Sequence, residues 1–296
     1  MIRLPYIEPV FRPPSEARSL ILQVTNGCSW NRCTFCEMYT QPQKRFNHKP
    51  LTETEKELAE MARAGVTAQR VFLADGDAMT LSVRRLKAIL QAIRRHLPSV
   101  RRISSYCLPR NLRHKSVDEL AELRALGLEL YYVGCESGDD LVLDRVDKGE
   151  DFASSLAALR KIKAAGAKSS VMILNGMGGK RYSEQHAVNS ARLMNEAQPE
   201  YLSTLVVSFP LGMERYQQGF RGEFEPLDQP GLFREMSLLL ENLELESTVF
   251  RSDHASNYLV LKGTLNRDKK RLLETVRQAL ERPDSVALRP EWLRGL

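Results

Sequence analysis

The stretch TNGCSWNRCTFCEMYT, residues 25–40, contains three of the five cysteines of this 296-residue chain, Cys28, Cys33 and Cys36. It continues directly from the apolar run SLILQV that begins at Ser19, which predicts a buried strand followed by a cysteine-bearing loop. The first residues lack the apolar core of a secretion signal, so we expect a cytoplasmic protein. In that reducing compartment a tight thiol cluster indicates metal binding or catalysis and not a disulfide framework.

Composition narrows the class of protein further. Hydrophobic residues make up 43% of the chain, which is enough for a full core, and no window of roughly 18 apolar residues predicts a membrane span. The formal net charge is +6, yet the basic residues are scattered in short pairs such as Arg84-Arg85 and Arg94-Arg95. Such pairs are typical of solvated helix faces. A nucleic-acid partner is therefore possible but not favoured.

Strand and helix patterns alternate along most of the chain, which predicts β/α units around a parallel sheet. The six expected strands lie within residues 19–25, 70–77, 101–108, 128–138, 167–179 and 201–210. The expected helices lie at residues 51–65, 86–97, 116–127 and 151–166, and begin again near residues 183, 231 and 267. We expect capping boxes from Thr52 with Glu55 and from Ser116 with Glu119. In such barrels the loops after the strands carry the chemistry, so the cysteine loop lies at the mouth.

The β/α rhythm ends at Pro210, where LGMERYQQGFRGEFEPLDQP forms a long segment rich in turn residues. The economical division has one main domain: residues 1–18 as an N-terminal extension, 19–210 as the barrel and 211–296 as a C-terminal extension that closes the barrel. We see no low-complexity segment and no clean linker.

The number of thiolates distinguishes the possible metal sites. Structural zinc needs four ligands, and no second cysteine pair follows, so His48 would have to complete that site. A [4Fe-4S] cluster held by three cysteines leaves its fourth iron without a protein ligand. That iron can then bind a substrate or cofactor. Three thiolates therefore favour an iron-sulfur cluster over structural zinc.

With these features the sequence resembles the radical S-adenosylmethionine (SAM) enzymes, over roughly residues 19–208. Their motif is three close cysteines after the first strand, with an aromatic residue before the last cysteine, as Phe35 is here. The resemblance implies a partial (β/α)6 TIM-like barrel, a [4Fe-4S] cluster on Cys28, Cys33 and Cys36, and cleavage of SAM to a 5′-deoxyadenosyl radical that abstracts hydrogen from a substrate. The first cysteine spacing is four residues, where the family usually has three.

The resemblance also implies SAM contacts on three later turns. In ADGDA, Gly76 keeps the turn and Asp77 offers a carboxylate to the SAM amino group; the alternative is that Asp75 and Asp77 cap the next helix. The implied ribose contacts are Glu136 and Ser137, and the implied adenine contacts are Gly176 and Met177, with a plain βα turn as the alternative for the latter pair.

Three segments, RPPSEA, FLADGDA and HASNYLVLKG, resemble segments of a group of short bacterial radical SAM proteins of the Elp3, MiaB and NifB type. The substrate of this group we cannot name. His254, Asn257 and Lys262 are the substrate candidates, and the alternative is that they satisfy backbone groups in a turn. Cys107 and Cys135 lie in apolar strand sequence and are expected to pack, with Cys107 a weaker candidate at the mouth.

A radical enzyme of this kind is oxygen-sensitive and needs a low-potential electron donor such as flavodoxin or ferredoxin. Two other hypotheses stay open on the residues alone. The first is an RNA-interacting module with a structural metal site, which predicts salt-sensitive binding without SAM turnover. The second is an electron-transfer or sensor protein that uses its iron-sulfur cluster without radical chemistry.

Overall fold

The computed structural model describes residues 5–295, which divide into two compact units. Unit 1 comprises residues 5–31, 36–133 and 160–169, and unit 2 comprises residues 32–35, 134–159 and 170–295. The boundary expected near residue 210 therefore falls inside unit 2. Neither unit is a continuous piece of chain, because segments distant in sequence pack together in each.

Unit 1 contains four parallel strands in the order β1-β4-β5-β6 and a small separate pair, β2 and β3. Their bounds are β1 Leu20–Gln23, β2 Thr25–Asn26, β3 Asn47–His48, β4 Arg70–Ala74, β5 Arg102–Cys107 and β6 Leu128–Glu136. The register places Leu20 beside Val71 and Ile103 beside Leu128. Each of the first four expected strands is confirmed, because its apolar run is buried between helices and the adjoining strands.

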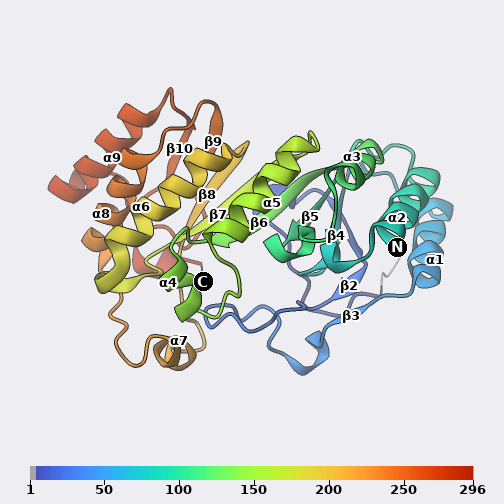
Figure 1. Cartoon of the computed structure of the whole chain (residues 1–296), viewed down its shortest axis with the longest axis horizontal. Helices are drawn as coiled ribbons and strands as arrows, with labels where there is room; N and C mark the ends of the chain where they lie inside the picture. Colours follow the sequence, from blue (N-terminus) through green and yellow to red (C-terminus); the bar gives the residue numbers. More distant parts are fainter. Residues whose placement is uncertain (1–4, 296) are drawn as a thin grey trace. The chain divides into compact units, whose positions relative to one another are not determined.

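Helices α1 (Leu51–Arg63), α2 (Val83–His96) and α3 (Val117–Ala125) follow these strands and pack in sequence, α1 on α2 and α2 on α3 (Figure 1). Ser116 and Glu119 form the expected capping box at α3. The box expected from Thr52 and Glu55 is wrong, because α1 begins at Leu51 with Pro50 at its N-cap. The N-cap therefore falls at Pro50, whose φ is fixed by its ring, two residues before Thr52.

Unit 2 continues with strands β7 (Lys168–Asn175), β8 (Tyr201–Val206), β9 (Thr248–Ser252) and β10 (Leu261–Leu265), in that order. β7, β8 and β9 are parallel, and β10 is antiparallel to β9. The fifth and sixth expected strands are confirmed as β7 and β8. The sequence did not predict β10, which adds an antiparallel edge to the parallel strands.

The helices of unit 2 include two short ones that periodicity did not predict, α4 and α7. Their bounds are α4 Asp140–Arg145, α6 Gly179–Ala197, α7 Glu214–Gly219, α8 Gln229–Asn242 and α9 Lys269–Glu281, while α5 Phe152–Ala164 contributes to both units. α6 begins at Gly179, one turn before the expected start near Ser183. α8 packs between α6 and α9, as Figure 1 shows.

Short 3-10 helices complete the chain and lie mostly in loops. They are η1 Pro14–Glu16, η2 Pro42–Lys44, η3 Ala78–Thr80, η4 Pro109–Leu112, η5 Pro283–Ser285 and η6 Glu291–Leu293. Among residues 5–295, no helix combines the length and apolar character that a bilayer crossing needs. In each unit the parallel strands deliver their carboxyl ends to one edge, so the turns that follow them are neighbours.

Candidate functional site

The loop that carries the cysteines is closed at its base in unit 1. β2 and β3 pair antiparallel, and the Asn26 side chain donates to the carbonyls of Gln43 at 2.7 Å and Arg45 at 3.0 Å. Gly27 has φ +67°, and a Cβ there would lie 2.0 Å from the carbonyl oxygen of Lys44. Only glycine fits this close approach of two backbones. The Asn-Gly pair before Cys28 therefore fixes where the loop starts and returns.

None of the three cysteines of the loop is in a disulfide, and all three are half-buried. Asn31, between Cys28 and Cys33, has left-handed backbone with φ 44°, and its side chain donates to the carbonyl of Tyr39 at 2.9 Å. This turn lies in the interval that is one residue longer than usual. Within residues 5–295 the structure does not gather three His, Cys, Asp or Glu side chains into a metal site. The role of Cys28, Cys33 and Cys36 as joint ligands thus stays a prediction.

The turn after β4 lies directly under an aromatic ring from the cysteine loop. A Cβ on Gly76 would stand 2.4 Å from a ring carbon of Tyr39, whose side chain is 5% exposed. Gly76 is therefore required for this contact, as the sequence predicts, although the partner ring was not foreseen. Tyr39 also packs edge-on against Phe11 with ring centroids 5.6 Å apart.

The two aspartates beside Gly76 are fully buried and bond to the cysteine loop. Asp75 pairs with the buried ammonium of Lys44, and Asp77 accepts from the hydroxyl and the backbone N–H of Ser29. Burial raises the pKa of Asp75 and of Asp77 above the ordinary range, against the lowering effect of Lys44 on the first and Ser29 on the second. Asp77 stands at the N-cap position of η3 (Ala78–Thr80) without a side-chain capping bond, and Ser82 caps α2, so the two carboxylates bond to the cysteine loop and not to a helix end.

The other two cysteines are packing residues in this structure. Cys107 is 2% exposed, and its thiol donates to the carbonyl of Leu108 at 3.4 Å. Burial raises the pKa of Cys135 to about 12, with Lys148 acting weakly in the opposite direction. A thiol with that pKa is neutral and unreactive at neutral pH.

Glu136, which ends β6, sits in unit 2 in a strained and buried position. Its φ is +64°, its side chain accepts from Lys148 Nζ at 3.0 Å, and its second oxygen, Oε2, is buried without a hydrogen-bond partner. Burial lowers the pKa of Lys148, but the charges of Glu136 and Cys33 more than offset this, so the pKa is raised. The same ammonium lies 5.7 Å from the centre of the Phe35 ring. Lys148 thus brings one positive charge to a carboxylate, a thiol and an aromatic ring.

Ser137 follows Glu136, but its hydroxyl faces the protein interior. Its Oγ lies 2.7 Å from Nδ1 of His186 and accepts from the backbone N–H of Asp139 at 2.9 Å. The side chain is fully buried. The hydroxyl is therefore already used within the protein, whereas Glu136 retains a free acceptor.

The turn after β7 contains Gly176 and Met177. Gly176 has φ +82°, and its N–H donates to Glu235 at 2.6 Å. Met177 is fully buried in an aromatic cluster, and its carbonyl accepts from the hydroxyl of Tyr216 at 2.6 Å. The turn is thus a supported left-handed turn, and Met177 contributes packing through its side chain.

The substrate candidates beyond β9 are His254, Asn257 and Lys262. Their polar groups bond mainly to their own loop and to the adjoining strands. Asn257 accepts from Val206 N at 3.0 Å and donates to Thr204 O at 2.8 Å. His254 Nδ1 accepts from the N–H of Ser256 at 3.1 Å, and burial lowers the pKa of His254, so its imidazole is neutral at neutral pH. Lys262 forms a half-exposed ion pair with Asp253 at 2.9 Å.

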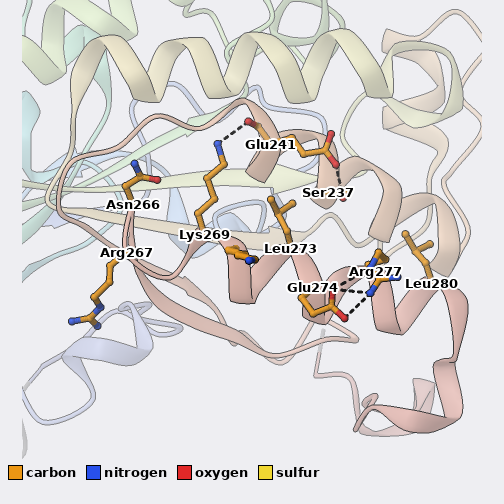
Figure 2. A pocket seen from close by; sticks show the side chains of 10 residues that line it. Ser237, Glu241, Asn266, Arg267, Lys269, Leu273, Glu274, Arg277 and Leu280 are labelled. Carbon is orange, nitrogen blue, oxygen red and sulfur yellow. Dashed lines mark hydrogen bonds and ion pairs between the residues drawn. The ribbon is translucent and has the colours of Figure 1, made fainter.

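A groove of about 650 Å³ between α8 and α9 lies away from these turns (Figure 2). Because β10 runs antiparallel to β9, the Asn266 that follows β10 lies at the amino edge of the parallel strands. The side chains that line it are partly neutralised: Arg277 pairs with Glu274 at 2.7 Å, and Lys269 donates to the Glu241 carbonyl at 2.8 Å. The groove is therefore separate from the candidate site.

Sequence reasoning missed Lys44, Lys148, His186 and Glu235. Each acts through a partner that is distant along the chain or lies in an irregular loop, so no periodicity or spacing marks it. Glu235, for example, bonds to a residue 59 positions earlier.

The family model for the radical SAM superfamily matches residues 22–194, which is more than half of the chain. The chain belongs to the radical SAM superfamily. Radical SAM enzymes use a [4Fe-4S] cluster and SAM and require an electron donor. The family match names no substrate for this chain.

Among curated proteins, 4′-phospho-dehydrooxetanocin synthase from Priestia megaterium is 25% identical over 166 residues, half of this chain. The chain spans about a fifth of the length of that relative, since the match covers 22% of it.

Two solved radical SAM structures are also similar. The coproporphyrinogen III oxidase HemN from Escherichia coli matches with TM-score 0.59 and 17% identity, over 76% of this chain and 54% of its own. The cobalamin-dependent radical enzyme OxsB matches with TM-score 0.52 and 16% identity, over 94% of this chain and 38% of its own. At these identities the likeness shows the fold, an α/β fold of the partial TIM-barrel type with a mostly parallel sheet, as expected.

The residues present fit both cofactors. None of the three thiols is in a disulfide, so each can serve as an iron ligand. The buried, unpaired Oε2 of Glu136 is an acceptor for a donor that SAM would bring, such as a sugar hydroxyl.

Proposed function

We propose that Cys28, Cys33 and Cys36 hold the [4Fe-4S] cluster and that its remaining iron takes SAM. The observation that carries this is a loop with three cysteines within nine residues, none of them in a disulfide, following the first strand of a chain that belongs to the superfamily. Bound there, the cluster supplies the electron that cleaves SAM to methionine and the 5′-deoxyadenosyl radical, which abstracts hydrogen from the substrate.

The protein's own residues would position SAM from several turns. Asp77 and the backbone at Gly76 would receive the amino group, because a buried carboxylate binds an ammonium well when both are desolvated. Glu136 would accept from the ribose, and its strained backbone and unpaired oxygen support that assignment. Gly176 and Met177 would lie along the adenine, with Met177 acting through backbone because its side chain is buried.

Ser137 and the segment after β9 take supporting roles in this proposal. Ser137 would hold the turn that carries Glu136, since its hydroxyl bonds inward. His254 and Asn257 would shape a substrate-facing loop beside the end of β8, and Lys262 with its partly exposed ammonium would meet the substrate. The division into an N-terminal extension, a barrel and a closing C-terminal extension is likewise proposed.

We further propose a low-potential donor such as flavodoxin or ferredoxin as the electron source, and the cytoplasm as the compartment. Loop cysteines that form no disulfide and the oxygen sensitivity of an open cluster suit a reducing environment. The basic residues are scattered along the sequence in short pairs, which favours a small molecule or another protein over a nucleic acid as the substrate.

The ligand assignment is tested by iron and sulfide analysis after anaerobic reconstitution. We expect about four irons and about four sulfides per chain. Cys28→Ala, Cys33→Ala and Cys36→Ala should each lose the cluster absorption, because alanine offers no thiolate. Cys107→Ala is the matched control and should keep it, since that thiol is buried in packing. Zinc without iron in anaerobically purified protein would overturn the proposal.

A further inference from the structure

A buried polar chain in unit 2 connects α6 and α8 to two of the turns described above. The Glu235 carboxylate accepts from the N–H of Gly176 and from the hydroxyl of Ser183, both at 2.6 Å. His186 Nε2 lies 4.0 Å from the same carboxylate, and His186 Nδ1 lies 2.7 Å from the hydroxyl of Ser137. The chain therefore runs from the turn after β6, through two helices, to the turn after β7.

The polar side chains that make this connection are deeply buried, and their burial excludes a direct role in catalysis. Ser137 is 0% exposed, His186 1% and Glu235 3%. The order serine, histidine and acid resembles a hydrolytic triad, but an inaccessible hydroxyl cannot attack a substrate. Burying a carboxylate and an imidazole costs free energy unless their polar atoms are hydrogen-bonded. We therefore expect these buried polar side chains to stabilise a particular local structure.

The hydrogen bonds define one consistent arrangement of protons. Ser137 Oγ accepts from the N–H of Asp139 at 2.9 Å, which leaves its own proton for Nδ1 of His186. The other ring nitrogen of His186, Nε2, faces the Glu235 carboxylate at 4.0 Å, which is a close polar approach but too long for a hydrogen bond.

Each end of this set of polar side chains stabilises a turn whose backbone is left-handed and lies outside regular helix or strand geometry. Gly176 is left-handed with φ +82°, and its N–H bonds to Glu235. At the other end, His186 holds Ser137, the residue next to Glu136, which is also left-handed with φ +64°. Strained turns persist only when their surroundings fix them.

We infer that Glu235 and His186 are positioning residues that fix the two turns for the adenosine part of SAM. The inference rests on the proposed function, in which Glu136 and the turn at Gly176 contact ribose and adenine. Glu235 lies on α8, outside the residues 22–194 that match the family model. The part of this chain beyond the family match thus sets the geometry of the cofactor turns.

The test compares SAM affinity in cluster-loaded variants by titration calorimetry. Glu235→Ala leaves the N–H of Gly176 without its acceptor, and we expect SAM affinity to fall about tenfold or more. Glu235→Gln keeps one oxygen for that N–H and should stay within about threefold of the parent. For His186, leucine should weaken binding, while asparagine, whose Oδ1 replaces Nδ1, should restore much of it. Glu241→Ala, on the exposed side of the same helix, is the matched control.

A second measurement does not depend on the cofactors. Amide hydrogen exchange on the protein without cluster should speed up at Gly176 in Glu235→Ala and at Asp139 in His186→Leu, but not in Glu241→Ala. A parent protein that binds no SAM would overturn the proposed function and this inference with it. A parent that binds SAM, with Glu235→Ala and His186→Leu binding equally well, would overturn the inference alone. Loss of affinity in Glu235→Gln as severe as in Glu235→Ala would also contradict it.

Discussion

Gly76 is the residue on which the turn after β4 depends. The ring of Tyr39 occupies the space that any side chain at position 76 would need. The sequence indicated the glycine, through ADGDA, and the cysteines, through their spacing. It did not indicate Tyr39 as the covering group, because a contact between residues 39 and 76 leaves no trace in local pattern. Lys148 was not predicted for the same reason: it lies in an irregular loop and forms a buried ion pair with Glu136.

Gly76→Ala should destabilise the protein and weaken SAM binding. The added methyl group would overlap the Tyr39 ring, and overpacking of this kind costs about 1–3 kcal/mol of unfolding free energy. Urea unfolding with a SAM titration measures both effects. Tyr39→Ala combined with Gly76→Ala should recover part of the loss, since the methyl group then has room. A single Gly76→Ala variant as stable as the parent would show that the ring is not held there.

Several elements of this molecule are connected by buried polar contacts in addition to the hydrophobic core. Lys44, on η2 of the cysteine loop, pairs with Asp75 at the end of β4, and both side chains are fully buried. The strands and longer helices were predictable, because each combines an apolar period with turn residues at its ends. The short helices α4 and α7 were not, since six residues are too few for a period, and Pro50 takes the N-cap position of α1 in place of the expected capping box.

Lys44→Met should cost about 3–5 kcal/mol, because it leaves the Asp75 carboxylate buried without its partner. The deficit should depend on pH. Burial already raises the pKa of Asp75, and loss of Lys44 raises it further, so the folded variant binds the proton more tightly than the unfolded chain. Its stability therefore falls as pH rises from the unfolded pKa, about 4, through the raised folded value.

Unfolding free energies of Lys44→Met and the parent, measured between pH 5 and 8, check the sign of this effect. The difference between the two proteins should be smaller at pH 5 than at pH 8. A pH-independent difference would mean that Asp75 is not the group left unpaired. Lys44→Met with Asp75→Leu should recover stability at every pH, since neither charge then remains buried.

At the scale of the whole molecule, the six β/α units and the family were predictable from the sequence, whereas the C-terminal part was only partly so. The expected short strand after residue 247 is β9, but β10 and the contacts of α8 with the turn at Gly176 depend on distant pairing. Neither the sequence pattern nor the fold identifies the substrate. His254 and Asn257 looked like specificity groups in sequence, yet their side chains bond within their own loop and to β8.

The most direct test of radical SAM chemistry in this chain is chromatographic detection of 5′-deoxyadenosine. Anaerobically reconstituted protein is incubated with SAM and dithionite, with Cys33→Ala as the inactive control. We expect 5′-deoxyadenosine and methionine to form in equal amounts with the parent and not with the control, because one cleavage yields one of each. Cluster-loaded parent that binds SAM and, on reduction, yields no 5′-deoxyadenosine would contradict the account.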